Sequence, residues 1–170
     1  MRQIFALILF LLSVGSPTST YADTALAQCL EKRLNAVLQG ENVKKHVVIR
    51  SMVFLAIGKG NFLTIEKNEP AIERFEKVIL ELMTTQIAKE GKPYIGSTVT
   101  LTEKEPKKNT TTGYLTVPNA VFTYTFGVSF NSRAECKIKD INIENAFKLF
   151  EWIREQPSFI TLMDEYNMKK

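Results

Sequence analysis

The sequence predicts an α+β domain in which about five helices pack against a four-stranded antiparallel curved sheet. Two observations predict this class. In the first and last parts of the chain, apolar residues recur every three or four positions, which is typical of helices. Between about residues 99 and 141 the period changes to two, with short turns between the segments, which is typical of strands in a meander. Helices on both sides of a run of strands indicate helices laid on one face of the sheet.

The first 22 residues are expected to be a signal peptide rather than part of the fold. Residues 1–3 form a short cationic head, and residues 4–14 (IFALILFLLSV) form an apolar run that is shorter than the roughly 20 residues of a membrane span. Small and polar residues follow and end at Ala22, as in a cleaved secretory signal. Cleavage after Ala22 leaves 148 residues (170 − 22), which is enough for one domain, 23–170, with a sizeable core.

Charge and composition narrow the class of partner. Removal of Arg2 with the signal leaves 21 Lys+Arg (22 − 1) against 18 Asp+Glu, or +3 with His46 neutral. This mild excess suits a protein that meets anionic surfaces. Lysines and arginines do not form a dense stripe interleaved with aromatic residues, so no nucleic-acid partner is expected.

The mature chain has two cysteines, Cys29 and Cys136. Export permits a disulfide between them. It would close a loop of 107 residues (136 − 29), and the chain-entropy model assigns such a loop about 4–5 kcal/mol. The alternative is a pair of buried thiols that never meet, and the sequence leaves both possibilities open.

Three helices are expected before the sheet. The first spans Asp23–Gln39, where leucines recur at helical spacing. The second spans Val43–Ile57 and ends at the glycines that begin with Gly58, although its β-branched residues leave a strand possible. The third spans Ala71–Lys89, with Pro70 at a favoured position in its first turn.

The strands are expected in the middle of the chain, at Val99–Leu101, Gly113–Val117, Val121–Phe130 and Cys136–Ile141. A polar loop over residues 103–112 is expected to be mobile. The third strand, VFTYTFGVSF, alternates bulky apolar residues with small polar ones. Because successive side chains of a strand point to opposite faces, one face of this strand carries Phe122, Tyr124, Phe126, Val128 and Phe130.

Two helices are expected after the sheet. Ala146, Leu149 and Ile153 lie on one helical stripe, which Pro157 interrupts. Ser158 is expected to cap the last helix.

The sequence does not indicate an enzyme. His46 is the only histidine, it lies beside lysines at a helix start, and no G-x-S-x-G elbow exposes a serine. One histidine and two distant cysteines do not make a zinc site. Asp140 shares strand parity with Cys136 and Ile138 and is therefore expected to face inward, but a strand-end aspartate that caps a turn is the simpler interpretation.

Three segments, in order around the four strands, resemble the MlaC-type family of periplasmic phospholipid-binding proteins (toluene tolerance, maintenance of lipid asymmetry). They are FLAIGKG at 54–60, ERFEKVILELM at 73–83 and CKIKDINIENAFKLF at 136–150. Within them, Ala56-Ile57-Gly58 matches the family's Ala-Leu-Gly, and Arg74-Phe75 matches the Arg-Phe that opens its long helix. The resemblance covers roughly residues 43–166.

The resemblance implies a cone-like fold with a deep apolar cavity that holds phospholipid acyl chains. It also implies a periplasmic carrier between an outer-membrane lipoprotein complex and an inner-membrane ABC transporter complex. Phospholipid would be the bound ligand of a monomer, with no cofactor, metal ion or catalytic residue. The side chains expected to line the cavity are Met52, Phe75, Ile79, Leu82, Met83, Val99, Leu101, Tyr114, Phe122, Tyr124, Phe126, Val128, Ile138 and Phe150. The alternative is an exported, non-enzymatic interaction protein with the same fold and a filled core.

Overall fold

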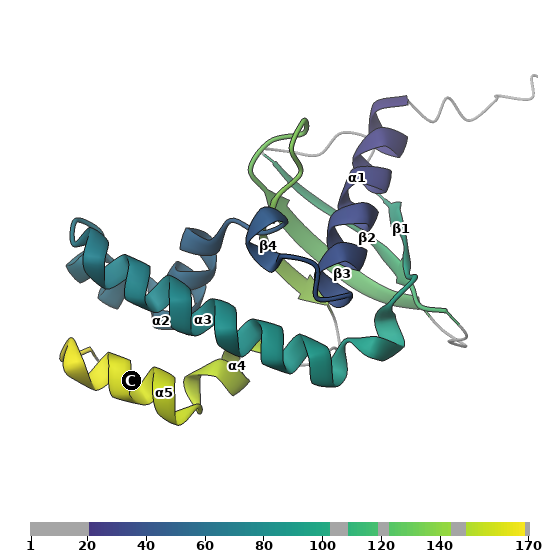
Figure 1. Ribbon diagram of the computed structural model, residues 1–170. Helices are drawn as coiled ribbons and strands as arrows, with labels where there is room; N and C mark the ends of the chain where they lie inside the picture. Colours follow the sequence, from purple (N-terminus) through teal and green to yellow (C-terminus); the bar gives the residue numbers. More distant parts are fainter. Residues whose placement is uncertain (1–20, 103–108, 119–122, 144–148, 169–170) are drawn as a thin grey trace, which may run out of the picture.

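The computed structural model describes residues 21–102, 109–118, 123–143 and 149–168 (Figure 1). Most of the expected signal peptide lies outside this part, and Tyr21 and Ala22 are the first residues of α1. The helices are α1 (Tyr21–Leu38), η1 (Val43–Lys45), α2 (Ile49–Ile65), α3 (Glu69–Glu90), η2 (Lys92–Tyr94), α4 (Leu149–Arg154) and α5 (Pro157–Glu165), where η1 and η2 are short 3₁₀ helices. The strands are β1 (Thr98–Leu101), β2 (Thr110–Thr116), β3 (Thr123–Phe130) and β4 (Ile138–Ile143).

The strands form one antiparallel sheet in the order β1-β2-β3-β4, so the predicted α+β class and the four-stranded meander are confirmed. The sheet is curved and unclosed (Figure 1). Within the described ranges, none of the helices is both long enough and apolar enough to cross a membrane.

One face of the sheet, here named the inner face, packs against α1, which crosses it in Figure 1. Leu26, Leu30 and Leu34 of α1 are buried, as the leucine spacing predicts. On the sheet, Val99 pairs with Leu115, and both are buried. The predicted alternation is therefore confirmed for these strands. On β1 the apolar side chains take the inner face and the threonines the outer one, whereas on β2 the inner face also carries the buried Thr111.

The helices α2, α3, α4 and α5 pack on one another and form a helical layer beside the sheet (Figure 1). Phe75 of α3 is fully buried there, with its ring centroid 6.1 Å from that of Phe159 and 5.7 Å from that of Tyr166. At the start of α3 the side chain of Asn68 accepts a 3.2 Å hydrogen bond from the backbone N–H of Ala71. The predicted third helix is thus confirmed, capped by Asn68.

The prediction for the second helix is wrong at both ends. Val47 forms an isolated parallel bridge with Ile138, and Val48 donates a 2.8 Å backbone hydrogen bond to the same residue, so α2 begins only at Ile49. At the other end the helix continues past Gly58 to Ile65. Gly58 has φ 78° and ψ 159°, a conformation almost restricted to glycine, and α2 is kinked there instead of ending.

The starts of β2 and β4 differ most from the prediction, and β4 also ends later, at Ile143 instead of Ile141. β2 begins at Thr110, inside the segment expected to be a mobile loop, whereas residues 103–108 of that segment lie outside the described part. β4 begins at Ile138 because Cys136 has φ 45°, outside the range of a strand.

The inward position expected for Asp140 is also wrong. The register shifts between Ser129 and Phe130, so that Phe130 pairs with Ile138 but Ser129 pairs with Asp140. Asp140 therefore shares the outer face with Ser129. The bulge changes the parity that uninterrupted alternation would give.

Both predicted C-terminal helices are present, and the start of the second differs from the prediction. The described part of the first is α4, and residues 144–148, which include Ala146, lie outside the described part. The N-cap position of the last helix is Gln156, whose side chain makes no capping hydrogen bond, and Pro157 lies in the first turn, so Ser158 is not the cap.

Candidate functional site

The contact between α1 and the inner face leaves a small apolar hollow. Its lining is formed by Leu30, Leu34, Val99, Leu115, Phe126, Val128, Ile138 and Ile141. The volume is about 10 Å³, which is roughly the space that one water molecule needs. Pockets for small organic ligands have volumes of about 300–1,000 Å³. At this place the core is filled by the protein's own side chains, and the hollow is not the deep cavity that the resemblance implies.

The residues predicted to line a lipid cavity fall into separate groups. Four of them line the hollow: Val99, Phe126, Val128 and Ile138. Leu101 and Tyr124 lie on the same inner face but are only half-buried. Met52, Phe75, Ile79 and Met83 are buried on α2 and α3, while Leu82 on α3 and Phe150 on α4 are half-buried. Phe122 lies outside the described residues.

Tyr114 does not belong with the other predicted lining residues. In the β2–β3 register Tyr114 pairs with Thr125, whereas its neighbour Leu115 pairs with Tyr124. Tyr114 is therefore on the outer face of the sheet, and 44% of its surface is exposed. It borders an open outer hollow of about 560 Å³, together with Thr102, Thr112, Gly113, Thr125, Phe126, Gly127 and Asn142. The two tyrosines proposed as neighbours of one ligand lie on opposite faces.

Sequence reasoning missed four residues that line the inner hollow: Leu30, Leu34, Leu115 and Ile141. The leucine spacing of α1 was visible, but it does not say which face of the sheet the helix covers. The alternation along β2 also includes Leu115. Neighbours on a strand point to opposite faces, so the expectation that Tyr114 lines the cavity placed Leu115 outside it.

Tyr124 marks the place where the inner face meets η2. Its ring centroid lies 5.9 Å from that of Tyr94, and the two ring planes are tilted by 57°. Burial raises the pKa of Tyr94, and Tyr124 beside it acts in the same direction. Tyr124 is itself half-buried, so an apolar edge of the inner face reaches solvent here.

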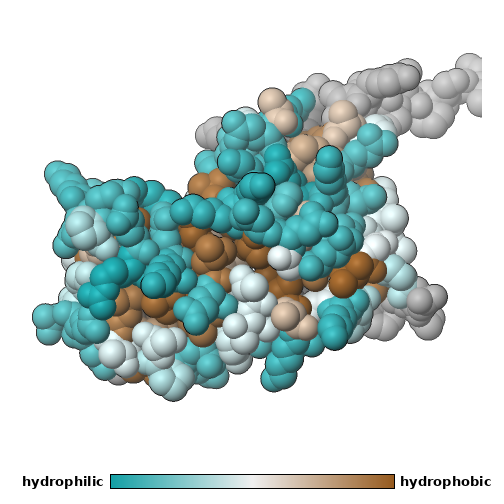
Figure 2. Space-filling model, in the orientation of Figure 1, coloured by the Kyte–Doolittle hydropathy of each residue, from teal (hydrophilic) through white to brown (hydrophobic). Residues whose placement is uncertain are grey.

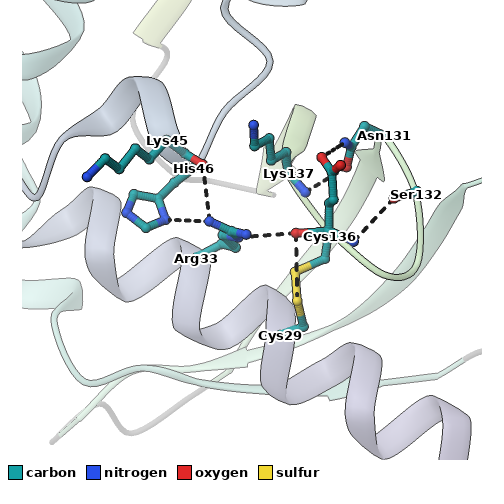
Figure 3. Close-up of a disulfide and its surroundings, with 9 residues drawn as sticks. Cys29, Arg33, Lys45, His46, Asn131, Ser132, Cys136 and Lys137 are labelled. Atoms are coloured by element: carbon teal, nitrogen blue, oxygen red, sulfur yellow. Dashed lines mark hydrogen bonds between the residues drawn. A yellow bond between two sulfur atoms is a disulfide. The ribbon is translucent and has the colours of Figure 1, made fainter.

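A disulfide and an arginine connect α1 to the start of β4 (Figure 3). Cys29 and Cys136 are joined, with their Cα atoms 6.2 Å apart. One turn further along α1, Arg33 donates from Nε to the carbonyl oxygen of Glu135, at 3.2 Å. Its Nη1 lies 3.1 Å from the carbonyl oxygen of Lys45 and 3.2 Å from Nδ1 of His46. These contacts fix the loop before β4 and the end of η1 against the same helix.

The contact with Arg33 also determines which ring nitrogen of His46 carries the proton. A guanidinium group has donors and no acceptor, so Nδ1 of His46 accepts and the proton of the neutral ring is on Nε2. Burial lowers the pKa of His46, and the positive charge of Arg33 lowers it further. His46 therefore acts as a structural acceptor in this cluster.

The described residues offer no group of three or more His, Cys, Asp or Glu side chains that could hold a metal ion. No family model matches the chain, and neither the curated proteins nor the solved structures contain a match.

Proposed function

We propose that this protein is an exported carrier that binds a phospholipid by its acyl chains between the inner face of the sheet and the helical layer. The observation that supports the proposal most directly is the incomplete cover of the inner face. Leu101, Tyr124 and Ile141 point to that face and stay half-buried, next to fully buried neighbours.

The helical layer supplies a second apolar surface. Figure 2 shows hydrophobic side chains in a band across the middle of the molecule, beside α3, between hydrophilic margins. On α3 itself, Val78, Leu80 and Leu82 are half-buried. The packing of α3 is mainly with the other helices, so the two apolar surfaces belong to parts of the fold that can separate without unfolding α3.

Such a carrier must bind an acyl chain about as strongly as a bilayer does. Burying an acyl chain stabilises by about 0.8 kcal/mol per methylene group, and extraction from a bilayer costs a similar amount. An acyl chain does not fit into the inner hollow, whose volume is about 10 Å³ in this structure. Binding on this proposal therefore requires the helices to move away from the sheet, and partner proteins would control when that happens.

The small hollow favours a second candidate. A core filled by its own side chains is what an exported interaction protein needs, and such a protein would use its surface alone. The two candidates differ in one measurable property, since a carrier retains or takes up phospholipid and an interaction protein does not.

A matched pair of tyrosines tests the carrier. The protein is exported into a periplasm, purified without detergent, and analysed by native mass spectrometry before and after incubation with phosphatidylglycerol vesicles. Tyr124→Asp places a carboxylate at the half-buried edge of the inner face and should abolish lipid binding. Tyr114→Asp places the same charge on the outer face and should leave it intact. Circular dichroism melting checks that both variants are folded.

The outcomes separate the candidates. Bound phospholipid near one per protein, lost with the Tyr124 variant alone, supports the carrier. A wild-type protein that carries no lipid and takes up none from vesicles contradicts the carrier and favours the interaction protein. Equal lipid binding by both variants contradicts the assignment of the inner face.

A further inference from the structure

Exposed apolar side chains gather on α2, on both sides of its kink. Among the described residues three large hydrophobic side chains are exposed, and two of them are Phe54 (38%) and Leu63 (55%). Phe54 lies before Gly58 and contacts Phe62 after it, with ring centroids 5.5 Å apart in an edge-to-face arrangement. Phe54, Phe62 and Leu63 are named here the α2 tip surface.

Two lysines flank this surface. Lys59 lies four residues before Leu63, on the same face of the second part of α2. Lys67 lies in the turn just after α2, which ends at Ile65. Both lysines are exposed, and within the described ranges neither forms an ion pair. The carboxylate of Glu69 is already engaged, because both of its oxygens accept 3.0 Å hydrogen bonds from Arg50. Glu66 is half-buried.

The fold presents this surface at an end of the molecule. In Figure 1 the connection between α2 and α3 lies at the end furthest from the sheet. The kink at Gly58 lets the second part of α2, from Lys59 to Ile65, take a different direction from the first. A flat surface can therefore contact the α2 tip surface without contacting the sheet.

We propose that the α2 tip surface docks on an anionic lipid bilayer. Aromatic and aliphatic side chains on one face of a helix insert at the boundary between headgroups and acyl chains. Lysine stems lie along apolar surface while their ammonium groups reach the phosphates, and an anionic leaflet attracts them. Leu63 has Lys59 on its own helix face and Lys67 in the turn that follows the helix. The inference goes beyond lipid carriage, since docking requires no bound lipid.

Vesicle sedimentation tests the docking. The exported protein, free of its leader, is mixed with vesicles of phosphatidylcholine alone or with about a third phosphatidylglycerol. Binding is expected only to the anionic vesicles. Leu63→Ser should weaken it about tenfold, because an exposed leucine no longer inserts. Lys59→Gln should weaken it about fivefold, the effect of one basic side chain at such a surface.

Two variants elsewhere control for the loss of an apolar group and of a charge. Tyr114→Ser removes the third exposed large hydrophobic side chain, on the outer face of the sheet. Lys32→Gln removes an exposed lysine of α1. Both should bind like the wild type. Equal weakening by the controls, or no binding of the wild type to anionic vesicles, overturns the proposal. In the second case a protein partner becomes the occupant to seek.

A fluorescence reporter gives an independent readout. Trp152 is the single tryptophan of the chain, so Trp152→Phe provides a silent background. In that background Leu63→Trp should shift its emission to the blue on addition of anionic vesicles, and Tyr114→Trp should not. No shift at position 63 contradicts insertion of the tip, whatever the binding curves show.

Discussion

The guanidinium of Arg154 on α4 donates a 2.9 Å hydrogen bond from Nε to the carbonyl oxygen of Ala56 on α2. Its Nη2 donates to the carbonyl oxygen of Leu55 at 2.7 Å. Because the backbone leaves helical geometry at Gly58, the carbonyl groups of the turn before it lose the N–H partners that a continuous helix would supply. Arg154 takes the place of those partners and holds the kink from another helix.

Removal of this contact should lower the stability of the fold. Arg154→Gln is expected to reduce the free energy of unfolding by about 1–3 kcal/mol, because two carbonyl groups lose a charged donor. Arg154→Lys should recover part of the loss, since an ammonium group still donates. Urea denaturation measures both. If the glutamine variant were as stable as the wild type, water would be satisfying these carbonyl groups and the kink would not depend on Arg154.

Two glycines of α2 should respond oppositely to the same substitution. Neither position would crowd an added Cβ, as nothing lies within 4 Å of it. Gly58 has φ 78°, where any other residue is strained, so Gly58→Ala should destabilise by about 1–3 kcal/mol. Gly60 has no such φ, and Gly60→Ala should stabilise by about 0.5–1 kcal/mol by restricting the unfolded chain. Thermal unfolding of the pair measures the sign, and equal shifts would mean that α2 is not kinked at Gly58.

The disulfide between Cys29 and Cys136 should contribute a large part of the stability. Replacing both cysteines by alanine is expected to lower the free energy of unfolding by up to about 4–5 kcal/mol, since the bridge closes a long loop in the unfolded chain. Dithiothreitol should destabilise the wild type to a similar extent. The double variant is the control and should not respond to the reductant. A wild type insensitive to dithiothreitol would indicate that the bridge is not formed in solution.

The pKa of His46 predicts a loss of stability in mild acid. Its folded pKa lies below 6.5, the value of an unperturbed histidine, so between these two values the unfolded chain binds a proton that the folded chain does not. The contribution is present above pH 6.5 and is lost as the pH falls through the folded pKa. His46→Gln retains an acceptor for Arg33 but does not titrate, so the stability difference between wild type and variant should change between about pH 8 and about pH 5. A constant difference would contradict the assignment.

Gln86 on α3 offers a further test of the core. Its side chain is 4% exposed, and Oε1 has no hydrogen-bond partner among the described residues. Gln86→Met, of similar shape, should raise the free energy of unfolding by about 1–3 kcal/mol, because the cost of an unsatisfied buried acceptor disappears. No gain in stability would mean that a water molecule or a bound ligand donates to this oxygen.

Some features of the fold were predictable from the sequence and others were not. The stripe of α3 and the alternation along β3 were predictable, because side-chain direction follows the local period of each element. The start of α2 was not, since Val47 and Val48 pair with Ile138, about 90 positions later in the chain. The parity of Asp140 was not predictable either, because the register shift beside Ser129 is a property of two strands together.

The sequence by itself determined the class of the fold, the order of its elements and the apolar side of α1, α3 and β3. Those follow from local periodicity and from the turn residues between elements. The tertiary structure alone decided that α1 packs on the inner face, that Tyr114 and Tyr124 lie on opposite faces, and that Arg154 holds the kink at Gly58. Each of these depends on contacts between residues far apart in the chain, which a local pattern does not encode.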